Sequence, residues 1–145
     1  RQCQLLEEPL LLAGGGATQI ALARHLRRFA ERFAGREQLA IEAFADALEI
    51  IPRTLAQNAG LDPLDSLLQT VAKQTTTGGT VGHRIGLNVD KKAPSDMVDD
   101  GVVEPLRITR QVLAGATEAA LSVLRIDDVL WAKQDPTEPD LPDED

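Results

Sequence analysis

The strongest hydrophobic pattern lies between residues 36 and 60, in the segment REQLAIEAFADALEIIPRTLAQNAG. Apolar residues recur there every three or four positions, which predicts one long amphipathic helix with a broad apolar face. Pro52 is expected to kink or interrupt this helix, because proline removes a backbone hydrogen bond. Gly60 then suits the left-handed position that follows a helix C-terminus.

Two further segments flank this helix and carry the same period. The first, residues 20–30, predicts a helix of about four turns that stops near Gly35. The second, LDPLDSLLQTVAK, starts directly after Gly60. Asp62 is its expected N-cap and Pro63 its first helical residue, because these residue types favour those positions.

The helical period is lost between residues 75 and 101, where five of the eleven glycines lie. Short β-favouring pieces there predict an irregular loop with one hairpin around residues 81–91. A long helix then follows, entered through Glu104 and Pro105, and the segment IDDVLWA (residues 126–132) predicts a short terminal strand. The fold class is therefore mainly α: a helical bundle with a small β-hairpin and a short C-terminal strand.

Composition places this fold in one domain, residues 1–133, followed by a disordered acidic tail, residues 134–145. Acidic residues number 23 against 15 basic ones, so a nucleic-acid partner is not expected. The single cysteine, Cys3, has no internal partner, and no apolar run is long enough to span a bilayer. We therefore expect a cytoplasmic location and no membrane partner. A chain that starts on Arg1, within an amphipathic pattern, is also expected to be a piece of a longer protein.

Self-contained catalytic chemistry is not indicated. The sequence has no GxxxxGK[ST] loop, no H-x-x-x-H pair and no cysteine cluster, so neither a Walker-type site nor a zinc site is supported. His25 and His83 are interpreted as ordinary solvated histidines. No catalytic residue and no metal ligand are assigned.

The glycine triplet Gly14-Gly15-Gly16 stands between the apolar run LLLA and the first helix. Glycines allow backbone N–H groups to approach a ligand closely, and a helix N-terminus favours anions. A flexible joint or a simple helix entry would explain the same residues. The triplet alone does not decide between these interpretations.

Several phrases together closely resemble the group II chaperonins, the archaeal thermosomes and their eukaryotic cytosolic relatives. They are AGGGA (13–17), the thirty residues 36–65, GVVEPLRI (101–108) and ATEAALSVLRIDDV (116–129). Their order and spacing match the C-terminal half of that family's equatorial domain, and the resemblance runs from about Leu5 to Trp131. It implies that the terminal IDDV segment pairs as a strand with a neighbouring subunit.

The resemblance implies an ATP-driven double ring that assists protein folding, with other chaperonin subunits and unfolded client proteins as partners. It implies ATP or ADP with Mg as cofactor, although most metal ligands belong to family segments outside this chain. The phosphate loop and the hydrolytic aspartates also lie outside it, so we expect no ATP hydrolysis by this chain alone. The nucleotide-binding residues that the family pattern assigns are Gly15 and Gly16 beside the nucleotide, Asn88, Val89 and Asp90 on the base and ribose side, and Glu104 at the ribose hydroxyls.

The chain departs from the family pattern at GLNVDKKAP, where relatives carry GIDV followed by a Thr-Gly turn. Two alternative functions are kept: a ligand-free helical scaffold or oligomerisation module, and a degenerate chaperonin paralogue that no longer hydrolyses ATP. Nucleotide should perturb the glycine triplet, the Asn88 segment and Glu104 in a chaperonin, and should perturb nothing in a scaffold.

Overall fold

The computed structural model describes residues 10–132, which are mostly helical. The chain divides into two compact units, one ending at Leu106 and the other beginning at Arg107. The described part of the first unit holds four helices and two strand pairs, and that of the second is a single helix. This confirms the predicted mainly α fold.

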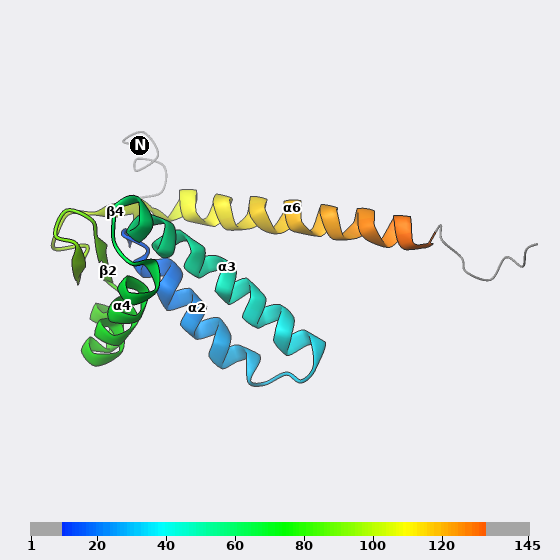
Figure 1. The fold of residues 1–145 in the computed structure, drawn as a ribbon, viewed down its shortest axis with the longest axis horizontal. Coiled ribbons are helices and arrows are strands. Elements are labelled where there is room, and N and C mark those ends of the chain that lie inside the picture. The colour runs from blue at the N-terminus through cyan, green and yellow to red at the C-terminus, as the bar shows by residue number, and fades with distance from the viewer. Residues whose placement is uncertain (1–9, 133–145) are drawn as a thin grey trace, which may run out of the picture. The chain divides into compact units, whose positions relative to one another are not determined.

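Helices α2 (Ala17–Ala30) and α3 (Arg36–Asn58) form an antiparallel helical hairpin (Figure 1). Small side chains dominate the buried positions of both helices, which allows the two backbones to approach closely. The buried residues include Ala23 and Ala30 of α2, and Ala45, Leu48 and Ala56 of α3.

A charged contact also joins these helices. Arg27 of α2 donates to Asp46 of α3 at 2.7 Å and to the buried carboxylate of Glu49. The hydrogen bond to Glu49 is the main cause that raises the pKa of Arg27, and partial burial opposes it. Glu49 is tolerated inside the hairpin because Arg27 compensates for its lost hydration.

The junction between α3 and α4 (Pro63–Thr77) confirms the predicted boundary signals. Gly60 has a φ of 74°, its N–H donates to Gln57, and the N–H of Leu61 reaches back to Ala56 at 2.9 Å. These two bonds form a Schellman motif, which satisfies the last carbonyls of α3. Asp62 then caps α4 by accepting from the N–H of Asp65 at 2.8 Å.

Two antiparallel strand pairs complete the first unit. Strand β2 (Ile85–Asn88) pairs with β3 (Ala93–Asp96), which confirms the predicted hairpin but shifts it toward the C-terminus. The shift arises because residues 79–82 form a short helix, α5 (Gly79–Gly82). The other pair, β1 (Leu11–Ala13) with β4 (Val103–Pro105), was not predicted.

The predicted terminal strand is wrong. Helix α6 (Leu106–Ala132) continues through the whole of residues 126–132. Ile126, Val129 and Leu130 extend the three- and four-residue apolar spacing of the preceding turns. A helix satisfies its own backbone groups, whereas a strand at this position would need another strand beside it.

Lys92, in the turn between β2 and β3, has a positive φ of 53° although it is not a glycine. Left-handed backbone costs a residue with a Cβ about 1–2 kcal/mol. Glycine avoids this cost, but it loses more chain entropy on folding, which offsets part of the gain. We expect Lys92→Gly to raise the free energy of unfolding by about 0.5–1 kcal/mol, measured by urea unfolding. Ala93→Gly is the control, because Ala93 lacks positive φ; it should lower the same quantity. A destabilising Lys92→Gly would contradict this account of the turn.

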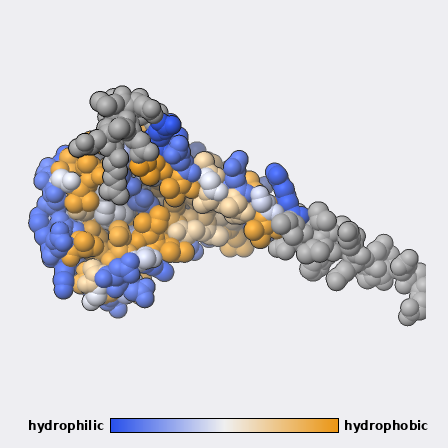
Figure 2. Space-filling view, turned by 90° about the horizontal axis from the view of Figure 1, so that it is seen from above, coloured by the Kyte–Doolittle hydropathy of each residue, from blue (hydrophilic) through white to orange (hydrophobic). Residues whose placement is uncertain are grey.

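Part of the predicted apolar face of α3 stays exposed. Leu39 and Ile50 of α3 are 65% and 58% exposed, and Leu68 of α4 is 58% exposed. The view in Figure 2 shows apolar patches bordered by hydrophilic side chains. The core of the first unit uses the sides of α3 that pack against α2, α4 and β2, and the remaining apolar positions of α3 stay exposed.

Candidate functional site

The glycine triplet crosses strand β2 at the start of α2. The N–H of Gly14 donates to Val102 O at 2.9 Å, and the carbonyl of Gly15 accepts from Leu87 N–H, also at 2.9 Å. Gly15 and Gly16 have φ values of 64° and 75°, in the left-handed region. The triplet is therefore bonded on both sides by residues far away in the sequence.

Close packing explains why glycine occupies these positions. A Cβ on Gly15 would lie 2.5 Å from Met97 Sδ and 2.7 Å from Leu87 O. A Cβ on Gly16 would lie 2.7 Å from Pro52 Cβ. The triplet is thus a packed crossing that also leads into α2, and the interpretation as a flexible joint is wrong.

A cavity of about 150 Å³ lies beside this crossing. Four of the residues assigned from the family pattern line it: Gly15, Asn88, Val89 and Asp90. Four apolar residues that were not assigned complete the wall: Leu55, Leu87, Met97 and Val102. The fold therefore brings the glycine triplet and the turn after β2 together beside α3.

The other two assigned residues do not line this cavity. Gly16 is buried against Pro52, and Glu104 lies on β4 opposite Leu12 of β1, where it is half-buried. The unassigned wall residues gave no distinctive signal, because buried leucine, valine and methionine are typical of any core. Leu55 lies within the apolar pattern that predicts α3, which carries no sign of a ligand site.

The side chain of Asn88 is occupied by the turn that it begins. Its Oδ1 accepts from the N–H groups of Asp90 and Lys91, both at 3.0 Å, and its Nδ2 donates to Asp100 at 2.8 Å. Asn88 is also 7% exposed. Its amide therefore stabilises the backbone conformation of the turn at Val89 and Asp90.

Asp100 is the acceptor at the centre of this turn. Its carboxylate receives hydrogen bonds from Lys91 Nζ at 2.5 Å, from Ser95 Oγ and from Asn88. The hydrogen bond from Lys91 is the main cause that lowers the pKa of Asp100 below its ordinary value, and the bonds from Ser95 and Asn88 lower it further. A lowered pKa means that the bonds stabilise the fold fully above about pH 4 and are lost as the carboxylate takes up a proton at lower pH.

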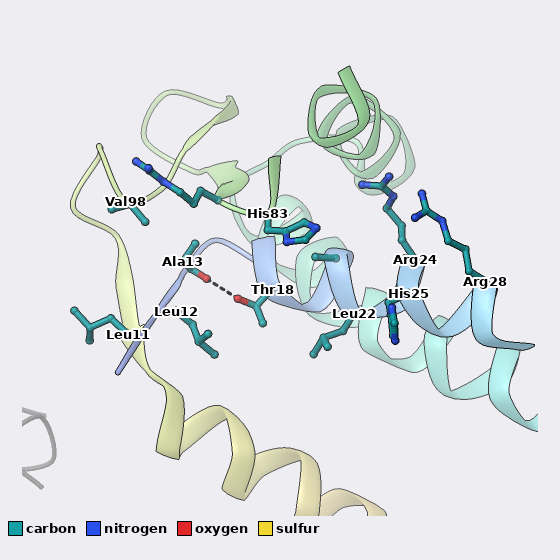
Figure 3. Close-up of a pocket in the computed structure, with 12 residues that line it drawn as sticks. Leu11, Leu12, Ala13, Thr18, Leu22, Arg24, His25, Arg28, His83 and Val98 are labelled. Atoms are coloured by element: carbon teal, nitrogen blue, oxygen red, sulfur yellow. Dashed lines mark hydrogen bonds between the residues drawn. The ribbon is translucent and has the colours of Figure 1, made fainter. Parts of the chain in front are cut away.

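A larger cavity of about 650 Å³ lies between β1 and α2 (Figure 3). Leu11, Leu12 and Ala13 of β1 form one side, and residues of α2, among them Leu22, Arg24, His25 and Arg28, form the other; His83 and Val98 also line it. Thr18 donates to Ala13 O at 3.2 Å in its floor. None of the assigned nucleotide residues lines this cavity.

The two histidines, interpreted as solvated, are exposed on the wall of that cavity. The residues lining it include no carboxylate that would orient an imidazole for proton transfer. Among the residues that the structure describes, no three His, Cys, Asp or Glu residues gather as a metal site. Nor does any helix in that part of the chain have the length and apolar character needed to cross a membrane.

Comparison with known families identifies the class of protein to which this fold belongs. The model of the TCP-1/cpn60 chaperonin family matches residues 3–134, so the chain belongs to that family. This confirms the resemblance to the group II chaperonins.

Individual members of this family are also similar to the chain. The chain is 55% identical to a thermosome subunit of Methanocaldococcus jannaschii over 89% of its own length, and 52% identical to thermosome subunit 1 of Haloferax volcanii over 88%. It also resembles the open-state monomer of a group II chaperonin from Methanococcoides burtonii, with a TM-score of 0.74 and 42% identity. That match covers 79% of this chain and 28% of the solved one. The chain spans only 23% and 22% of the two thermosome subunits.

Proposed function

We propose that this chain contributes to an ATP-dependent group II chaperonin that assists protein folding. In this proposal it supplies the glycine crossing and the base and ribose side of an ATP pocket, together with contacts to other subunits of a double ring. The observation that carries the proposal is the cavity shared by Gly15, Asn88, Val89 and Asp90. These residues come from two distant segments, and their convergence is what a composite ligand site requires.

The chemistry of the cavity suits one end of a nucleotide. Leu55 and Val89 offer apolar surface for a flat base, and the Asp90 carboxylate offers an acceptor for hydroxyl groups. A volume of about 150 Å³ is too small for a whole nucleoside triphosphate, which points to partial enclosure. The phosphates and Mg would be held mainly by groups outside this chain. Glu104 is kept as the proposed contact to the ribose.

Val89 provides a direct test, because its side chain is 41% exposed and lines the cavity. We expect Val89→Asp to weaken ADP binding in the full-length protein by about tenfold or more, since it replaces apolar contact with a charge that must lose hydration. Isothermal titration calorimetry measures this effect. Val81→Asp is the matched control, because Val81 is 46% exposed and does not line the cavity. Equal affinities for the two variants would argue against the proposed site.

Native mass spectrometry of the full-length protein, with and without ATP in high potassium salt, tests the assembly. We expect a double ring of long subunits. In the cell, this ring would work in the cytoplasm and would bind unfolded clients through its other domains. A ring that binds ATP without turnover would favour the degenerate paralogue. A small species that binds no nucleotide would favour the ligand-free scaffold and contradict the proposed function.

A further inference from the structure

The turn that carries Val89 and Asp90 to the cavity is not held by strand pairing alone. The register of β2 with β3 ends at Asn88 opposite Ala93, so residues 89–92 lie beyond the last pair. Val89 and Asp90 are both exposed, and Lys92 has left-handed backbone. Hydrogen bonds other than those of the strand pairing are therefore needed to fix this turn.

Asp100 meets that requirement from the segment after β3. Its two carboxylate oxygens take hydrogen bonds from Asn88 before the turn, from Lys91 inside it and from Ser95 after it. Asn88 in turn accepts from the backbone N–H groups of Asp90 and Lys91. The carboxylate itself is largely shielded, with 13% of the side chain exposed.

We propose that Asp100 is a positioning residue for the nucleotide pocket, which fixes through Asn88, Lys91 and Ser95 the turn that places Val89 and Asp90 at the cavity. This inference rests on the proposed function. Asp100 itself does not line the cavity, so it acts on the ligand only through this turn. The neighbouring Asp99 differs, because it is 74% exposed and pairs with Arg84 instead.

The test is ADP affinity of full-length Asp100→Asn, measured by calorimetry with thermal unfolding of the same samples. An amide cannot accept from all three donors while carrying two hydrogens of its own, so the turn loosens. We expect about tenfold weaker binding, because small displacements of contact groups have effects of this size or larger. Asp99→Asn is the control and should bind like the parent protein. Ser95→Ala removes one donor only and should give a smaller loss.

A double-mutant cycle separates positioning from general destabilisation. If Asp100 acts through Asn88, then Asp100→Asn should weaken ADP binding much less in an Asn88→Ala background than in the parent.

Each outcome has a separate meaning. A parent protein that binds no ADP or ATP would contradict the proposed function itself. A parent that binds, with Asp100→Asn equal to Asp99→Asn or fully additive with Asn88→Ala, would overturn only the role of Asp100. If Asp100→Asn does not fold, Ser95→Ala decides, and unchanged affinity there overturns the inference.

Discussion

Gly15→Ala is expected to destabilise the first unit by about 3 kcal/mol or more. The new Cβ would lie 2.5 Å from Met97 Sδ and 2.7 Å from Leu87 O. The sulfur can shift, but the carbonyl belongs to β2 and moves only if the strand moves. Overpacking of this kind costs about 1–3 kcal/mol, and the φ of 64° adds about 1–2 kcal/mol for a residue with a Cβ. Urea unfolding followed by circular dichroism measures the loss.

Gly60→Ala is the matched control for this experiment. Gly60 has a φ of 74°, but nothing lies within 4 Å of the position that its Cβ would take. It therefore reports the cost of left-handed backbone alone, about 1–2 kcal/mol. If Gly15→Ala costs no more than Gly60→Ala, the close packing of the glycine crossing is not what requires glycine there.

Gln74→Leu should lower the free energy of unfolding by about 2–3 kcal/mol. Gln74 is 1% exposed, and its Nε2 donates to Ala17 O at 3.0 Å and to Ile85 O at 2.8 Å. These bonds tie α4 to the start of α2 and to β2. Leucine has a similar size but no donor, so two buried carbonyls lose a hydrogen-bond partner. Thermal and urea unfolding of the variant measure the effect.

The control for Gln74→Leu lies on the same helix. Gln69 is exposed, and its Nε2 donates to the exposed carboxylate of Asp65. Gln69→Leu should change the free energy of unfolding by less than about 0.5 kcal/mol. Equal losses in the two variants would mean that the buried amide is not an important connection between α4, α2 and β2.

The features predicted correctly from sequence are those that depend on local signals. The apolar period fixes α3, and the left-handed Gly60 and the capping Asp62 mark boundaries within a few residues of the groups they bond. The pairing of β1 with β4 had no such signal. Each strand has three residues, and the two come from opposite ends of the first unit.

The candidate site was likewise predicted only in part from the sequence. The family pattern assigned Gly15 and the Asn88 segment, and the fold brings them to one cavity. The apolar walls, Met97 and Val102 among them, could not be distinguished from other core residues before the tertiary structure was known. The sequence also did not reveal that the amide of Asn88 is used to hold its own turn. Binding of nucleotide by these residues stays a prediction.

The strand pair that closes the first unit also sets an order of folding. The helical hairpin of α2 and α3 is local, so it can form while a growing chain is still being made. Strand β1 and Gly14 cannot find their partners until residues 102–105 have been synthesised. The glycine crossing and its cavity are therefore completed last. A nascent chain that stalls before Val102 would carry a formed hairpin with an unpaired strand edge, the state in which this unit is most exposed to aggregation.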